Sequence, residues 1–90
     1  MKILKIGAVW CSGCLVMRPR WQKIEKQIQD LNTEYFDFDE RKDIVEQYKI
    51  ENSKLPVFIF LDKDGNELER KTGEVEEAVL IEIINKYKGM

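Results

Sequence analysis

The apolar run Val57–Leu61, with the sequence VFIFL, constrains the fold of this chain more than any other feature. Five consecutive apolar residues have the length of a strand, and a strand without polar alternation is typical of one that is covered on both faces. Such a strand needs neighbouring strands in a sheet and helices on each side of that sheet. The chain has 90 residues, which is the size of one domain. We therefore expect a single domain, residues 1–90, of the α/β class.

Three further strands are expected from short apolar or alternating stretches. They lie at residues 3–8, 33–39 and 67–72. Residues 62–66 (DKDGN) have the composition of a turn, so the run Val57–Leu61 and residues 67–72 should form a hairpin whose second strand lies at an edge. Asp37 and Asp39 fall on the polar face of residues 33–39, where we expect them to face water.

Helices are expected where apolar residues recur at steps of three and four. This spacing occurs over residues 14–31, 41–48 and 75–88. Trp21 belongs to the apolar stripe of the first helix and is expected in the core. Pro19 lies inside the same helix and predicts a kink there. The resulting order, βαβα followed by ββα, predicts a four-stranded mixed sheet with helices on both faces.

Charge and composition exclude several classes of function. The chain carries 15 Lys and Arg against 17 Asp and Glu, a net charge of −2, and this balance favours neither nucleic acid nor an anionic membrane as a partner. No apolar run approaches the roughly 18 residues of a membrane span. The chain has no histidine, which excludes a Ser-His-Asp triad, a Cys-His pair and a Cys/His zinc finger. Chemistry must therefore depend on cysteine, carboxylate, lysine or tyrosine.

Cys11 and Cys14 form a Cys-x-x-Cys pair at the point where the first strand gives way to the first helix. A bond between them closes a minimal loop and removes little entropy from the unfolded chain, so its value is chemical. A helix N-terminus stabilises an anion, and Cys11 should ionise more readily than a free thiol. We expect Cys11 to be the more exposed cysteine and to attack a target disulfide. Cys14, one turn on and more buried, would resolve the mixed disulfide.

Four features occur together along the chain. They are Trp10-Cys11-Ser12-Gly13-Cys14 after an apolar strand, Pro19 inside the following helix, Leu55-Pro56 before the hairpin, and Gly73 after the last strand. Together they resemble the thioredoxin-like superfamily, and the resemblance covers nearly the whole chain. It implies a thioredoxin-like fold and a thiol–disulfide oxidoreductase that uses a reversible Cys11–Cys14 disulfide.

The resemblance also implies a substrate-binding surface around the cysteines. Trp10 would line the surface on which protein substrates dock. Pro56 would follow a cis peptide bond and face the active site. Its neighbour Leu55 would offer backbone hydrogen bonds to an extended substrate peptide, and Gly73 would complete this surface.

Departures from the family pattern concern the residues that tune the redox couple. Ser12 and Gly13 stand where thioredoxins usually have Gly-Pro. Lys5 stands where thioredoxins carry a buried aspartate that accepts the proton of the resolving thiol. If Lys5 faces the site, its charge favours thiolates and makes the protein more oxidising. The small size resembles a glutaredoxin, but the Cys-Pro-Tyr-Cys, Thr-Val-Pro and Gly-Gly motifs of that family are absent.

The expected partners follow from this resemblance. They are disulfide-containing protein substrates and a thioredoxin-reductase-like electron donor, with no cofactor, no metal and a monomeric state. Residues 1–10 lack the long apolar run and cleavage site of a signal peptide, so we expect a cytoplasmic protein. An alternative is a non-enzymatic thioredoxin-fold module. It would sense oxidation, or hold zinc or an iron–sulfur cluster between two chains, with the same Cys-x-x-Cys.

Overall fold

The computed structural model describes residues 1–90 and contains four strands and three α-helices. In chain order they are β1 (Lys2–Gly7), α1 (Ser12–Gln27), β2 (Asn32–Asp37), α2 (Lys42–Gln47), a short 3-10 helix (Asn52–Lys54), β3 (Val57–Leu61), β4 (Glu67–Thr72) and α3 (Glu77–Tyr87). The predicted order of strands and α-helices is confirmed. The 3-10 helix, which leads the chain into β3, was not predicted. None of the helices has the length and apolar character required to cross a membrane.

The sheet has the strand order β2-β1-β3-β4. β1 runs parallel to β2 and antiparallel to β3, and β3 runs antiparallel to β4. The sheet is therefore mixed, as predicted. β1 and β3 occupy the centre, while the more polar strands β2 and β4 lie at the edges, where their outer backbone groups can meet water.

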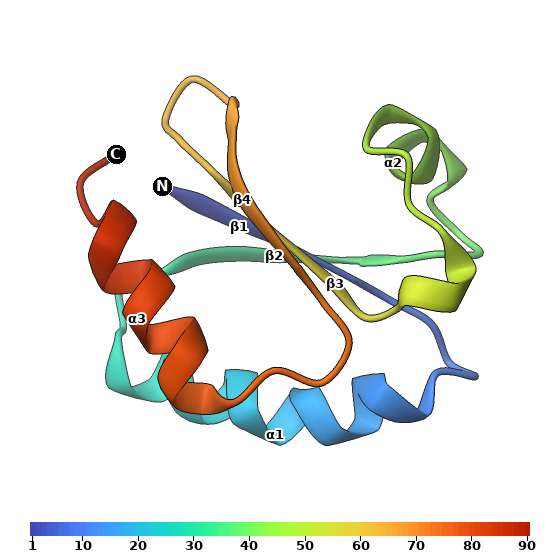
Figure 1. Ribbon diagram of the computed structural model, residues 1–90, viewed down its shortest axis with the longest axis horizontal. Helices are drawn as coiled ribbons and strands as arrows, with labels where there is room; N and C mark the ends of the chain where they lie inside the picture. Colours follow the sequence, from blue (N-terminus) through green and yellow to red (C-terminus); the bar gives the residue numbers. More distant parts are fainter.

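The run Val57–Leu61 is buried on both faces, and this is the reason that it carries no polar residue. Phe58 and Phe60 face α1 and α3, whereas Val57, Ile59 and Leu61 face the side covered by α2. Figure 1 shows α1 and α3 together on one side of the sheet and α2 on the other. The larger core cluster comprises Ile3, Met17, Trp21, Ile24, Phe58, Phe60, Val75, Leu80, Ile83 and Ile84.

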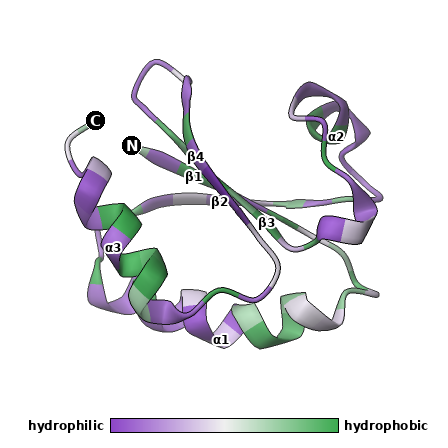
Figure 2. Cartoon of the chain, viewed as in Figure 1, coloured by the Kyte–Doolittle hydropathy of each residue, from purple (hydrophilic) through white to green (hydrophobic).

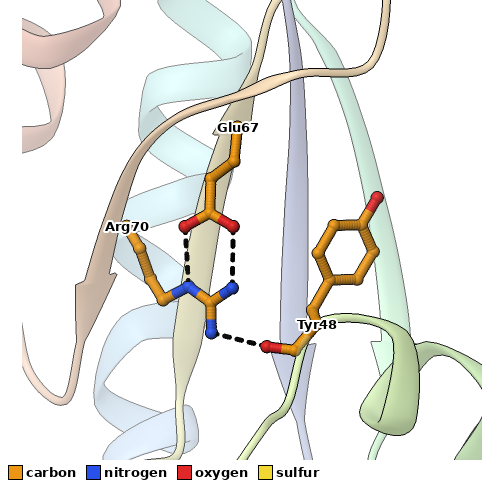
Figure 3. Close-up of polar contacts among 3 residues, drawn as sticks. All are labelled: Tyr48, Glu67 and Arg70. Carbon is orange, nitrogen blue, oxygen red and sulfur yellow. Dashed lines mark hydrogen bonds and ion pairs between the residues drawn. The ribbon is translucent and has the colours of Figure 1, made fainter.

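The edge strand β4 is hydrophilic along most of its length (Figure 2) and holds helices on both faces through side-chain hydrogen bonds. Arg70 donates to the backbone carbonyl of Tyr48, just after α2, at 2.8 Å, and it forms a bidentate pair with Glu67 (Figure 3). On the other face, Glu69 accepts a hydrogen bond from the hydroxyl of Tyr87 at the end of α3, at 2.9 Å. Successive residues of one strand thus fix elements on opposite sides of the sheet.

Outside β3 and β4, the observed element boundaries differ from the predicted ones by one to four residues, and the ends of α1 and β2 differ for clear reasons. α1 ends at Gln27 rather than near residue 31, because Ile28 leaves the helical conformation and the chain turns toward β2. Ile28 and Leu31 still pack on the core, so the apolar spacing continued through the turn and mimicked a longer helix. β2 ends at Asp37 rather than residue 39, since its partner strand β1 ends at the paired residue Gly7.

Candidate active site

Cys11 is the N-cap of α1, and its side chain therefore lies where backbone N–H groups of the first turn are unpaired. Its Sγ accepts a hydrogen bond from the backbone N–H of Cys14 at 3.2 Å. The two cysteines form a disulfide, with their Cα atoms 5.3 Å apart. The first turn of the helix thus holds both sulfurs at its N-terminus, where the helix dipole favours a thiolate.

The expected exposures of the two cysteines are wrong. Cys11 is buried, with 7% of its surface exposed, while Cys14 is partly exposed. The reason is local: the Cys11 side chain folds back over the first turn as the N-cap, whereas Cys14 lines a cavity beneath α1. Helix position, rather than exposure, is therefore what distinguishes the two sulfurs.

Pro56, Gly13 and Gly73 meet beside the disulfide. The Leu55–Pro56 peptide bond is cis, as the family resemblance implies. The backbone N–H of Gly73 donates to the Pro56 carbonyl at 2.7 Å. A Cβ added at Gly13 would lie only 3.0 Å from Cδ of Pro56, so the absence of a side chain allows α1 to approach the proline. Leu55 is partly buried and packs on the core cluster that lies on the α2 side of the sheet.

Trp10 is half-exposed in the loop between β1 and α1. Its Nε1 donates to the Asp39 carboxylate at 2.7 Å, and its ring meets Phe38 edge-on at a centroid distance of 6.1 Å. Asp37 accepts backbone N–H bonds from the loop after β2, at 2.9 and 3.1 Å, and so fixes the turn that presents Asp39. Both aspartates thus lie at the end of β2, and Asp39 orients the tryptophan.

A cavity of about 400 Å³ lies beside Cys14, between α1 and the strands β1 and β2. Lys5 lines it together with Cys14 and so faces the site. Its Nζ lies 3.1 Å from a carboxylate oxygen of Glu25 and 5.6 Å from the ring centroid of Trp21. The other Glu25 oxygen accepts from the hydroxyl of Thr33 at 2.6 Å. Lys5 therefore has a counterion, and that counterion is held in place by a second bond.

Glu25 and Tyr35 line this cavity, and the sequence reasoning missed both. Glu25 lies 20 residues from Lys5. Tyr35 alternates with Phe36 and so shares the polar face of residues 33–39 with Asp37 and Asp39, where a role in the site was not expected. The available signal was the parallel pairing of the first two strands, which sets Tyr35 directly beside Lys5. Burial raises the pKa of the Tyr35 hydroxyl, the Asp37 carboxylate raises it further, and Arg18 acts in the opposite direction. Tyr35 is therefore a neutral hydrogen-bond donor near neutral pH.

A family model described as thioredoxin matches residues 1–83, nearly the whole chain and both cysteines. The chain belongs to the thioredoxin family. A thioredoxin H-type from Fagopyrum esculentum is 32% identical over 81 residues, which cover 90% of this chain and 67% of that protein. A thioredoxin from Chlamydia trachomatis is 31% identical over 86 residues, covering 96% of this chain and 81% of that one.

Solved thioredoxin structures agree with this assignment. Thioredoxin from Fasciola hepatica superposes with a TM-score of 0.83 at 28% identity, covering 97% of this chain and 80% of that one. Thioredoxin 1 from Thermosipho africanus gives a TM-score of 0.81 at 30% identity, with 97% and 93% covered. The protein is accordingly a thiol–disulfide oxidoreductase of thioredoxin-like fold. Its partners, as the family implies in general, are disulfide-containing protein substrates and a reductase.

Proposed function

We propose that Cys11 is the attacking cysteine and Cys14 the resolving one. In the reducing direction, the Cys11 thiolate attacks one sulfur of a target disulfide and expels the other target sulfur as a thiolate. Cys14, as a thiolate, then attacks the Cys11 sulfur, which forms the Cys11–Cys14 bond and releases the second target thiolate. Two electrons pass to the target, and the two protons of the cysteine thiols end on the target thiols. The supporting observation is that Cys11 is the N-cap of α1.

The substrate would dock as an extended peptide across Trp10, Leu55, Pro56 and Gly73. This proposal is supported by the exposed apolar surface beside the disulfide, where Val9 is 89% and Trp10 53% exposed. The first turns of α1, next to this loop, are also hydrophobic (Figure 2). An apolar area at a redox centre suits unfolded or extended segments of protein substrates rather than a charged small molecule.

The remaining features of the proposal concern redox tuning and context. Ser12 and Gly13, between the two cysteines, and Lys5, in the cavity beside Cys14, would set the reduction potential. We further propose that residues 1–90 form a single domain that acts as a monomer in the cytoplasm. A thioredoxin-reductase-like donor would reset its disulfide. Sedimentation velocity tests the oligomeric state.

Insulin reduction with a dithiol reductant tests the roles of the two cysteines. Cys11→Ser should abolish turnover. Cys14→Ser should keep the first attack, and the pre-reduced variant mixed with insulin in the absence of the dithiol should accumulate a mixed disulfide, visible on a non-reducing gel. Circular dichroism of each variant checks that the fold is retained. A Cys11→Ser variant as active as the parent would overturn the assignment, and an inactive but folded parent would favour the non-enzymatic alternative.

The reduction potential decides the direction of electron flow. Equilibration with glutathione gives this value directly for the Cys11–Cys14 couple. A potential of about −270 mV would make the protein a reductant of other proteins, and one of about −120 mV would make it an oxidant.

A further inference from the structure

Gly7, the last residue of β1, leaves an opening that is bordered by two reactive side chains, Cys14 and Tyr35. A Cβ added at Gly7 would lie 2.9 Å from Sγ of Cys14 and 3.1 Å from Oη of Tyr35. Both atoms therefore border the same position, one from α1 and the other from β2, and they are at most 6.0 Å apart. The absence of a side chain at Gly7, which is itself buried, is what allows this approach.

The Tyr35 hydroxyl is a donor available for Cys14. The ring lines the cavity together with Cys14, and the hydroxyl makes none of the side-chain hydrogen bonds within the protein. By contrast, the hydroxyl of Tyr87 is engaged by Glu69. A phenol that stays protonated near neutral pH can donate one hydrogen bond to a sulfur anion.

The charged groups around this pair come from three elements. Lys5 of β1 is paired with Glu25 of α1 at 3.1 Å, so their opposite charges largely offset each other. Arg18 of α1 and Asp37 of β2 also line the cavity, again with opposite signs. The four charged groups that line the cavity thus offset each other in pairs, and the neutral Tyr35 hydroxyl borders the opening at Gly7 together with the Cys14 sulfur.

We propose that the Tyr35 hydroxyl donates a hydrogen bond to the Cys14 thiolate whenever the Cys11–Cys14 disulfide is open, and that Tyr35 is a catalytic residue of the resolving step. The inference deepens the proposed function and rests on the role of Cys14 in it. When a thiolate attacks the Cys11 sulfur, the Cys11–Cys14 bond breaks and Cys14 leaves with the electron pair. The hydrogen bond stabilises that charge. In the opposite direction it holds Cys14 deprotonated for its attack on the mixed disulfide.

The test measures the ionisation of Cys14 without any turnover. In a Cys11→Ser background, Cys14 is the single thiol, and the rate of its alkylation by iodoacetamide is followed against pH. Tyr35→Phe, which keeps the ring, should raise the midpoint of the profile by about one pH unit, so that well below the midpoint the thiolate fraction falls about tenfold. The matched control is Tyr48→Phe, which removes a hydroxyl on the opposite side of the sheet and should leave the profile unchanged.

The protein with both cysteines provides a second readout. With Tyr35→Phe, the reduced form loses stabilisation only where Cys14 is ionised, so the glutathione equilibrium should shift toward the disulfide as pH rises. A tenfold shift corresponds to a potential about 30 mV more negative. At low pH, where the Cys14 thiol is protonated in both proteins, the two potentials should coincide. A merely structural effect of the substitution would not produce this pH dependence.

Gly7→Ala provides an independent variant of the same interaction. Its Cβ would lie 2.9 Å from the sulfur and 3.1 Å from the hydroxyl, so these side chains must move to admit it; the variant should therefore raise the midpoint as Tyr35→Phe does, and the double variant should shift no further. An unchanged profile for Tyr35→Phe, or additive shifts in the double variant, would overturn the inference. The proposed function is judged separately, because insulin turnover of Cys11→Ser and Cys14→Ser does not depend on the profile.

Discussion

Replacing Gly73 with alanine tests whether this position serves substrate binding or only the backbone. Gly73 has φ = +78°, and its N–H bond to the Pro56 carbonyl ties the end of β4 to the proline. An added Cβ meets nothing within 4 Å, so Gly73→Ala causes no clash and keeps the hydrogen bond. The cost is the left-handed backbone, about 1–2 kcal/mol, offset by about 0.4–1 kcal/mol of unfolded-state entropy. The net loss of about 1 kcal/mol predicts a Tm about 4–8 °C lower.

Gly65 provides a matched control for this prediction. It has φ = +87° in the turn between β3 and β4, at the far end of β4 from Gly73, and its added Cβ also meets nothing within 4 Å. Gly65→Ala should therefore lower Tm by a similar amount in thermal unfolding followed by circular dichroism. Only Gly73→Ala places a methyl group where a docked peptide would lie, and it should reduce kcat/KM for insulin about fivefold, equivalent to about 1 kcal/mol.

Two outcomes would refute this reasoning. If both variants keep the parental Tm, the positive φ angles are not required by the fold. If both lose stability equally and keep the parental kcat/KM, Gly73 is a backbone residue and has no part in docking. Turnover is measured well below both Tm values, so that a lower stability does not appear as a lower activity.

Three further predictions follow from the core and the ion pairs. Glu25→Gln leaves the Lys5 ammonium unpaired beside Cys14, so the alkylation profile of the Cys11→Ser protein should move to lower pH; a shift to higher pH would contradict this. Phe60→Ala removes a fully buried ring and should cost about 3–5 kcal/mol in urea unfolding, whereas a loss under about 1 kcal/mol would show that the ring is not packed as described. The hydrogen bond from the Tyr87 hydroxyl lowers the pKa of Glu69, and the charges of Lys86 and Lys71 lower it further. The Glu69 carboxylate therefore stabilises the fold above its unfolded pKa, and this stabilisation is lost as the pH falls through the lower folded pKa. The Tm difference between the parent and Glu69→Gln should therefore be largest near neutral pH and disappear in acid.

The fold could be predicted from the sequence because its strongest patterns are local. The run Val57–Leu61 matches β3 to the residue, and residues 67–72 match β4, since turn residues bound both strands. The end of α1 could not be predicted from periodicity alone. Ile28 and Leu31 bury their side chains from a turn as effectively as from a helix, and apolar spacing does not distinguish the two.

The site was only partly predictable, for a physical reason. The Cys-x-x-Cys pair was located from its spacing at the start of a helix, and Leu55-Pro56 was located from the family resemblance. Their environment depends on strand register, which pairs Lys5 with Tyr35, and on helix packing, which brings Glu25 to Lys5. The exposure of the two cysteines was reversed because nothing in the sequence shows that an N-cap side chain folds back over its helix.

The ion pair between Lys5 and Glu25 changes the effect that a lysine at this position has on the cysteine thiolates. An unpaired ammonium beside the disulfide would favour both thiolates and make the protein strongly oxidising. With a carboxylate at 3.1 Å, the lysine acts as one half of a dipole whose effect falls off more steeply with distance than that of a single charge. Stabilisation of the Cys14 thiolate then depends on uncharged donors near the sulfur, and the hydroxyl of Tyr35 borders the same opening at Gly7 as the sulfur does. The chain has no histidine, so a neutral phenol takes the place that an imidazole could occupy beside a reactive thiol.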